Sequence, residues 1–367
     1  MKYIRYHELT LTLSMLAGAT CVTAGQVETK NADKLTISGY TQARFGFEDM
    51  DDSSAVDNAI FIKRSRAKLA AQISERTTLV VQLDFASSSL LKDAFVTFSP
   101  ADAVTFTAGQ FKRPFSREEL ASSSKTPTLD RGLANSLSTG LFYGGRDQGL
   151  AVTLRNKARS LRFTGGIFSG VGEKGVSSGD KLGSAQSDAQ NRAKDFAARL
   201  DYSPGLAWGT LNVAGNLSLR TAGANYLESL LTHSSKTFSS FGGDAQIELQ
   251  SGLTVIVEAL SGDDFTQFDD TLASFTAPTF FGGHLAALFH AKMQGATTVT
   301  AIQPEARLEI FDPNTDIDND GSSLFSGGVS LFFGKNMRWR NNITVRTFQD
   351  DLRDSETTFG SELQGLF

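Results

Sequence analysis

The stretch Val104–Leu120, VTFTAGQFKRPFSREEL, changes its pattern halfway along. In its first half, apolar and polar residues alternate, which is the period of a β-strand with one apolar and one polar face. The alternation stops at Pro114, and Ser116 with Glu119 then forms the capping-box pattern of a helix start. No new alternating segment begins before about Gln148. The stretch therefore predicts a strand that leads into a long segment containing a short helix.

The same alternation recurs on both sides of this stretch. In Leu35–Glu48 the odd positions are mostly apolar and the even positions mostly polar. Sixteen such segments can be counted between residues 34 and 367, joined alternately by short turns such as 99–102 and long polar connections such as 170–190. An even number of strands and this loop asymmetry are typical of a transmembrane barrel. The predicted fold class is all-β, a 16-stranded antiparallel transmembrane β-barrel. The alternative, a soluble β-sandwich or β-helix, explains the alternation but not the strand number and the loop asymmetry.

The first 24 residues have the features of a secretory signal peptide. Lys2 and Arg5 precede the apolar run Leu9–Ala19, and the small residues Val22-Thr23-Ala24 have the pattern of a cleavage site. Cleavage there would remove Cys21, the single cysteine, so that neither a disulfide nor a cysteine metal site is expected. The predicted organisation is a signal peptide at 1–24, a short N-terminal segment at 25–33 and a β-barrel at 34–367, with a constriction loop at 114–147.

The composition excludes several classes of function. The net charge of −5 argues against a broadly basic nucleic-acid binder. Outside the N-terminus no apolar run reaches the ~20 residues that a membrane helix needs. The sequence has no Gly-x-Ser-x-Gly, no Cys-x-x-Cys-His and no phosphate-binding glycine loop. We therefore expect neither an enzyme nor a cofactor.

Six segments are recognisable together: Phe61–Leu69, Leu91–Val96, Gly109–Leu120, Asp130–Leu137, Gly145–Leu150 and Phe311–Asp320. They resemble the phosphate-selective porin O/P family. This resemblance implies a sixteen-stranded, trimeric channel of the bacterial outer membrane, with its third long loop folded inward. It also implies passage of anions, because the family's anion-selective members use lysines at the constriction and arginines along the lumen.

Basic residues recur on the polar faces, which line water if the apolar faces contact lipid. Closure of the barrel puts the last strand beside the first, so that these residues form one wall. Guanidinium groups bind oxyanions well, and a basic strip in a narrow lumen attracts them. Alternatively, the arginines only pair with acidic residues across the lumen. The predicted anion-path residues are Arg44, Arg64, Arg66, Lys68, Arg338, Arg340 and Arg346.

The predicted constriction loop carries basic residues of its own, Arg113, Arg117, Lys125 and Arg131. We expect Arg117, Lys125 and Arg131 to contact solute, and other loop charges to hold the loop against the wall. Whether the loop charges select phosphate or only fix the loop stays open in the sequence.

Near the C-terminus, one acidic loop has the oxygen density of a calcium site. It lacks glycine at the sixth position and glutamate at the twelfth, and so does not match the EF-hand pattern. We expect a solvated outer loop and no metal, with weak calcium binding as the alternative. The candidate ligands are Asp312, Asn314, Asp316, Asp318 and Asp320.

The function predicted from the sequence is a channel of the bacterial cell outer membrane for passive diffusion of small hydrophilic solutes, biased toward anions such as phosphate. The alternative is a general or cation-favouring diffusion porin, and a barrel enzyme or a sheath for another protein fits less well. The expected partners are outer-membrane lipid and lipopolysaccharide, small anions and two further copies of the chain in a homotrimer, with no nucleic acid.

Overall fold

The computed structural model describes residues 32–49, 58–173, 194–222, 236–266, 277–295 and 298–367. The predicted signal peptide lies outside the described residues, as does most of the short segment that follows it. Within the described part, no helix is both long and apolar enough to cross a membrane.

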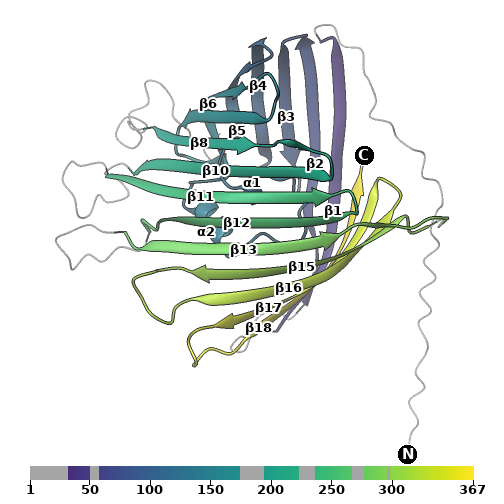
Figure 1. The fold of residues 1–367 in the computed structure, drawn as a ribbon, viewed down its shortest axis with the longest axis vertical. Coiled ribbons are helices and arrows are strands. Elements are labelled where there is room, and N and C mark those ends of the chain that lie inside the picture. Colours follow the sequence, from purple (N-terminus) through teal and green to yellow (C-terminus); the bar gives the residue numbers. More distant parts are fainter. Residues whose placement is uncertain (1–31, 50–57, 174–193, 223–235, 267–276, 296–297) are drawn as a thin grey trace, which may run out of the picture.

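The chain forms a single closed sheet of antiparallel strands. Successive long strands pair with each other, and the last pairs with the first over ten residues, from Tyr40 opposite Leu366 to Asp49 opposite Thr357 (Figure 1). The prediction of a 16-stranded antiparallel barrel is confirmed. The long strands are β1 (Lys34–Asp49), β2 (Asn58–Ser74), β3 (Thr77–Asp84), β4 (Leu91–Ala101), β5 (Val104–Lys112), β6 (Arg146–Arg155), β7 (Leu161–Phe168), β8 (Asp195–Tyr202), β10 (Gly209–Ala222), β11 (Lys236–Leu249), β12 (Leu253–Asp263), β13 (Thr279–Phe289), β15 (Ala301–Asp312), β16 (Ser322–Phe333), β17 (Met337–Phe348) and β18 (Glu356–Leu366).

Two further strands have only two residues each and extend hairpins near their turns. They are β9 (Gly205–Leu206), paired with β10, and β14 (Ala291–Lys292), paired with β15. The connections differ strongly between the two ends of the barrel. Those at one end, such as 75–76 and 102–103, are short, whereas those at the other include 113–145 and 169–194. In outer-membrane barrels the longer loops are extracellular.

The side chains are arranged inside out, as strand β15 illustrates. Leu308 and Ile310 are 57 % and 56 % exposed, whereas the intervening Arg307 and Glu309 are buried. Because successive side chains of a strand point to opposite faces, one face of β15 presents hydrocarbon outward and the other presents charge inward. This arrangement buries ionic groups in the lumen and leaves apolar groups for lipid.

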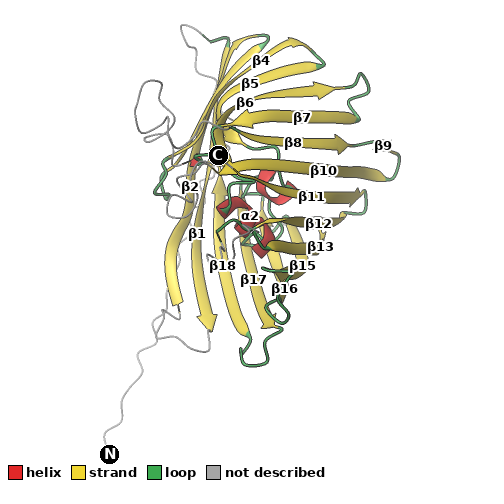
Figure 2. Ribbon diagram, turned by 90° about the vertical axis from the view of Figure 1, so that its left-hand side faces the viewer, coloured by secondary structure: helices red, strands yellow, loops and turns green. Residues whose placement is uncertain are grey.

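The segment between β5 and β6 contains two short helices, α1 (Arg117–Leu120) and α2 (Leu133–Gly140). Both views of the molecule show them inside the outline of the sheet (Figure 2). The Ser116 hydroxyl accepts a hydrogen bond from the backbone N–H of Glu119, as the capping-box pattern predicts. The Glu119 carboxylate, however, pairs with Arg131 at 2.9 Å, so that only half of the predicted box forms.

An apolar cluster packs this segment against the wall. It joins side chains of the segment to others from β11, β12, β13 and the end of the β12–β13 hairpin. Burial of these aromatic and aliphatic groups fixes one end of the segment against the inner surface. The buried members are Phe115, Ala134, Leu141, Tyr143, Phe238, Leu260, Phe265 and Phe280.

Gly109 allows the close approach of β5 to β4 just before this segment. Its φ is +127°, a conformation that other residues rarely adopt. A Cβ at this position would lie 2.2 Å from the carbonyl oxygen of Ala94, so that any larger residue would push the two strands apart.

Candidate functional site

Residues 121–130 lie along the polar faces of β1, β17 and β18. The side-chain amide of Gln42 donates a hydrogen bond to the carbonyl of Ser123 at 3.3 Å. That of Gln364 donates to the carbonyl of Ser124, also at 3.3 Å. These contacts join the middle of the segment to strands from both ends of the sequence.

Three buried charges, Arg44, Arg340 and Glu362, form the centre of this contact. The Glu362 carboxylate lies 2.8 Å from Arg44 and 3.1 Å from Arg340, and none of the three side chains is more than 5 % exposed. Arg44 also binds the Asp130 carboxylate of the segment at 2.6 Å. Both guanidinium groups donate to carbonyl oxygens of the segment, Arg340 to that of Thr128 and Arg44 to that of Leu129. Both arginines were predicted to lie on the anion path, and the structure places them in the attachment of the segment instead.

Three more of the predicted anion-path residues also have carboxylate partners. Their guanidinium groups lie on the polar faces, as expected, but a neighbouring carboxylate neutralises most of the charge of each. The pairs are Arg66 with Asp84 at 2.8 Å, Arg338 with Glu305 at 3.4 Å and Arg346 with Glu356 at 3.8 Å.

The other two predicted residues, Arg64 and Lys68 on β2, have no such partner. Arg64 donates to the side-chain oxygen of Gln42 at 3.1 Å, and both residues are partly exposed. No carboxylate of a described residue lies within ion-pair distance of either side chain. These two cations therefore keep their charge available to the lumen.

Arg113, at the start of the segment, is completely buried. It pairs with Asp147 and, at 2.6 Å, with Asp195, and its guanidinium stacks on the ring of Phe168 at 5.2 Å. It joins the segment to β6, β7 and β8 and has no contact with the water-filled space.

The other loop residues divide into held and available cations. Arg131 pairs with Glu119 at 2.9 Å and donates to three carbonyls of the segment. Arg117 is 24 % exposed and reaches Asp244 only at 4.0 Å, and burial lowers its pKa from the usual value. Lys125 is exposed and forms no ion pair with another described residue. Lys125 and, in part, Arg117 are thus the loop cations open to solute.

Two wall carboxylates that the sequence did not single out hold the helices. Glu258 of β12 accepts hydrogen bonds from the backbone N–H groups of Arg117, at 2.7 Å, and Glu118, at 3.0 Å. Glu309 of β15 accepts one from the backbone N–H of Leu133 at 2.6 Å. Each carboxylate satisfies orphan donors of the first turn of a helix. Their spacing is that of any lumen residue, so no sequence signal distinguishes them.

Glu118 on α1 completes this attachment. Its carboxylate binds the Arg307 guanidinium and accepts from the backbone N–H of Gly132 at 3.0 Å. Burial disfavours the charged form of Glu118, but Arg307 outweighs it and holds the pKa below the usual range. The acid is therefore ionised and locked in place.

Glu118, Glu258 and His284 bring one ligand atom each within 4.8 Å of one another, the only such metal-type group among the described residues. Arg307 binds the first carboxylate, and backbone N–H groups bind both. A cation there would have to displace or face a guanidinium, so the group fits an attachment of the segment better than a metal centre.

The acidic loop after β15 makes local contacts instead. The Asp312 carboxylate accepts from the backbone N–H of Asn314 at 3.0 Å, and the Asn314 side chain accepts from that of Asp316 at 3.1 Å. Such turns account for part of the acidic pattern without an ion.

Comparisons with known proteins agree with this architecture. A family model described as phosphate-selective porin O and P matches residues 38–234. No curated protein sequence is significantly similar to the chain. Among solved structures, the outer membrane channel DcaP of Acinetobacter baumannii has a TM-score of 0.65 at 11 % identity, covering 94 % of this chain and 100 % of that one.

Two other solved structures are similar in the same way. OprB of Pseudomonas putida has a TM-score of 0.64 at 10 % identity, covering 91 % of this chain and 94 % of that one. A protein of Comamonas acidovorans, described as an anion-selective porin, has a TM-score of 0.61 at 11 % identity, covering 91 % and 99 %. At these identities the similarity concerns the fold.

Proposed function

This chain belongs to the phosphate-selective porin O and P family and is a porin of the bacterial outer membrane, and from that premise we propose how its lumen favours anions. The segment 113–145 narrows the barrel, and solutes pass between its free edge and the wall that contains β2. Arg64 and Lys68 on that wall, with Lys125 on the loop, bias passage toward small anions such as phosphate.

The observation that carries this proposal is the unequal neutralisation of the two signs of charge. Most acidic side chains of the inner wall are held by arginines, whereas Arg64 and Lys68 have no acidic partner among the described residues. Glu258 also has no cationic partner among the described residues, but it is buried against the backbone N–H groups of α1. The charge that Arg64 and Lys68 present to the lumen is therefore positive. In a narrow aqueous path with low-dielectric walls, such a charge raises the local concentration of anions. The paired acids include Asp84, Asp93, Asp201, Asp244, Glu305 and Glu362.

A general or cation-favouring porin is the second candidate, and two acids support it. Glu48, near the long-loop end of β1, and Glu248, near the short-turn end of β11, have no arginine or lysine within ion-pair distance among the described residues. Both lie toward the mouths of the barrel, whereas Arg64 and Lys68 lie in the middle of β2. Since a narrow middle governs selectivity more than a wide mouth, we favour the anion bias.

Reversal potentials in planar bilayers test the proposal directly. The wild-type channel should be anion-selective under a potassium chloride gradient and also under a potassium phosphate gradient. The double variant Arg64→Gln, Lys68→Gln should lower the anion-to-cation permeability ratio by about twofold to fivefold for each charge removed. This factor corresponds to an interaction energy of roughly 0.5–1 kcal/mol between one such charge and a passing ion through water. The single-channel conductance should change little, because the attachment of the loop is untouched.

The matched control is Lys157→Gln, which removes the same charge from the exposed turn between β6 and β7. It should leave the ratio unchanged. A cation-selective wild type, or a double variant with the wild-type ratio, would establish the general porin instead.

We infer further that the channel works as a homotrimer in contact with outer-membrane lipid, and that it has no catalytic role. One structural neighbour, OmpT of Vibrio cholerae, is described in a trimer form. Chemical cross-linking of the intact protein in mild detergent should give a species of three chains, and a species of one chain would refute the inference.

A further inference from the structure

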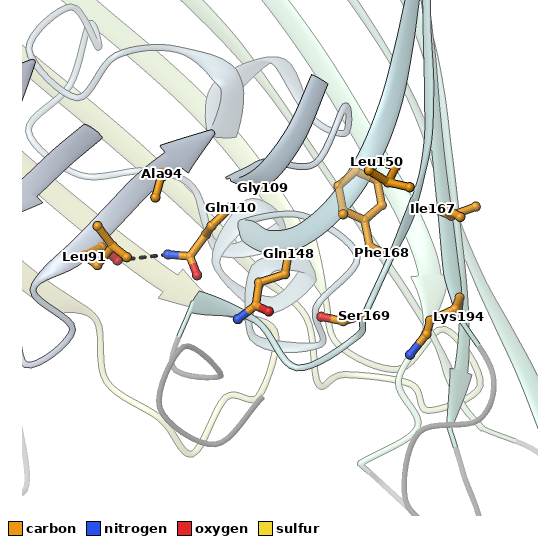
Figure 3. A pocket seen from close by; sticks show the side chains of 11 residues that line it. Leu91, Ala94, Gly109, Gln110, Gln148, Leu150, Ile167, Phe168, Ser169 and Lys194 are labelled. Atoms are coloured by element: carbon orange, nitrogen blue, oxygen red, sulfur yellow. Dashed lines mark hydrogen bonds between the residues drawn. The ribbon is translucent and has the colours of Figure 1, made fainter. Parts of the chain in front are cut away.

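Cavities lie on both sides of the barrel wall. The one drawn in Figure 3 is on the lipid-facing side, since Leu150 and Ile167, which line it, are 58 % and 51 % exposed. Another, of about 430 Å³, is enclosed by the polar faces of β1, β2 and β15–β18 and by loop residues 128–133, and we call it the luminal cavity. Gly46 and Glu48, near the long-loop end of β1, line it as well. It therefore lies in the lumen, between the loop and the extracellular mouth.

Strand β2 contains a β-bulge that changes which of its side chains face this cavity. Gln42 of β1 lies opposite Arg64. The next residue, Ala43, lies opposite Ile62, so that Lys63 is an extra residue in the ladder. From Arg64 onward the even positions of β2 face inward, whereas before the bulge the odd positions do. Bulges re-aim side chains in this way next to functional sites.

The bulge places an apolar surface inside the lumen. Phe61 lies opposite the inward-facing Arg44 and is 40 % exposed. A Cβ at Gly46 would meet only the Phe61 ring, at 3.9 Å, so there is open space beside this ring. Leu129 and Leu133 of the loop line the same cavity. An apolar surface in a water-filled lumen is stabilised by a solute that covers it with hydrocarbon.

Two cations adjoin this apolar surface. Lys63 is 32 % exposed and binds the Asp130 carboxylate at 3.1 Å, which uses one of the three donors of its ammonium group. Asp130 is also bound by Arg44 at 2.6 Å, so that its negative charge is offset. Arg64, the next residue of β2, has no acidic partner within the described part of the chain. A carboxylate between Lys63 and Arg64 would be attracted by both.

Two further acids line the cavity without opposing such a ligand. Glu309 is buried and accepts a hydrogen bond from the backbone N–H of Leu133 at 2.6 Å. Glu48 lies at the outer rim, because the strand from Ala43, beside the bulge, to Glu48 is about 17 Å long. A single ring with one carboxylate is much shorter, so its charged end can bind at the bulge while Glu48 stays in water.

We infer that the luminal cavity binds a small organic anion with one flat apolar ring and one carboxylate, as in benzoate. The ring lies against Phe61, Gly46 and Leu129, and the carboxylate binds Lys63 and Arg64. Phosphate has no apolar part and gains nothing from the ring contact. The inference rests on the proposed function, because the solute reaches the cavity along the proposed anion path, and it adds a class of solute that charge alone would not select.

Block of single channels by benzoate tests this inference. In potassium chloride, benzoate should reduce the wild-type current in a saturable way. Acetate, which has the charge without the ring, and benzyl alcohol, which has the ring without the charge, should need much higher concentrations. Phe61→Ala should raise the half-blocking concentration of benzoate by about fivefold to tenfold, the loss expected for one aromatic contact. Phe61→Tyr keeps the ring and should stay within about twofold of the wild type.

A second variant fills the cavity without touching Phe61. Gly46→Val places methyl groups in the open space beside the ring, where a Cβ meets no other atom within 4 Å, and should raise the half-blocking concentration to a similar extent. The matched control is Phe325→Ala, which removes the same ring from the lipid-facing side of β16, where it is 47 % exposed. This control should be blocked like the wild type.

Equal block of the wild type by benzoate and acetate would overturn the inference, because charge alone would then explain binding. So would wild-type block of both Phe61→Ala and Gly46→Val. Reversal potentials of Phe61→Ala should equal those of the wild type, since no charge changes. An anion-selective channel that benzoate does not block overturns this inference alone, whereas a cation-selective wild type overturns the proposed function.

Discussion

Two neighbouring strands of the inner wall carry basic residues in the same alternating pattern but in different surroundings. Arg44 on β1 is buried, shares Glu362 with Arg340 and binds the loop. Arg64 and Lys68 on β2 are partly exposed and unpaired with any described carboxylate. The difference shows that an inward arginine becomes structural where the loop or a wall carboxylate binds it, as Asp84 binds Arg66 on β2, and remains available to solute where neither does.

The contact between loop and wall explains why Arg44 and Arg340 need the Glu362 carboxylate. The two guanidinium groups share the buried Glu362 carboxylate, and the loop adds a second carboxylate, that of Asp130, at 2.6 Å from Arg44. Backbone carbonyls of the loop supply further acceptors to both arginines. Charges of this kind are costly to bury unless every donor is satisfied. The loop and the wall therefore stabilise each other, and neither is expected to keep its geometry alone.

The largest effect should follow from removing the shared acid. Glu362→Gln leaves Arg340 buried without a counter-charge and Arg44 with only the exposed carboxylate of Asp130, and should lower the free energy of unfolding by about 3–5 kcal/mol. Thermal unfolding followed by circular dichroism measures this change. Single-channel recordings should also show a larger, noisier conductance, because the loop loses its anchor.

The matched control is Glu356→Gln on the same strand. Its carboxylate lies 3.8 Å from Arg346 and is partly exposed, so the change should cost only about 0–1 kcal/mol. Equal losses of unfolding free energy from the two substitutions would mean that burial of Arg44, Arg340 and Glu362 does not make Glu362 more important than a surface carboxylate.

A smaller effect should follow from crowding the second anchor. A Cβ at Gly132 would lie 2.0 Å from the Arg307 guanidinium that binds Glu118, so Gly132→Ala should displace that pair and cost about 1–3 kcal/mol. The conductance should rise as α2 moves from the wall. Gly140→Ala adds the same methyl group where no atom lies within 4 Å and should stabilise the protein slightly. A Gly132 variant as stable as the Gly140 variant would contradict the role of this contact.

The smallest effect should come from the free cation of the loop. Lys125→Gln should lower the anion-to-cation permeability ratio roughly twofold or less, since an exposed charge acts through water. The effect should nearly vanish in 1 M salt, where the Debye length is about 3 Å. Lys335→Gln, in the turn between β16 and β17, removes an exposed lysine away from the loop and should change nothing. An effect of Lys125→Gln that persisted at high salt would indicate direct solute contact instead of a long-range field.

Alternation in the sequence predicted the strands because a barrel wall has one apolar and one polar face, and each residue's face depends only on its position along the strand. The break at Pro114 and the cap at Ser116 were likewise local properties, and the structure contains both the strand end and the cap. The function of each inward cation was not local. It depended on which part of the loop, or which carboxylate of a neighbouring strand, lies beside the cation.

The sequence by itself determined the closed wall of sixteen strands, the family and the place where the chain leaves the wall to form a loop. Only the tertiary structure decided that Arg44, Arg113 and Arg340 hold this loop while Arg64, Lys68 and Lys125 stay available. The physical reason is that pairing depends on residues hundreds of positions apart, as with Arg44 and Glu362. Burial of one charge by a distant segment cannot be predicted from the residues next to it.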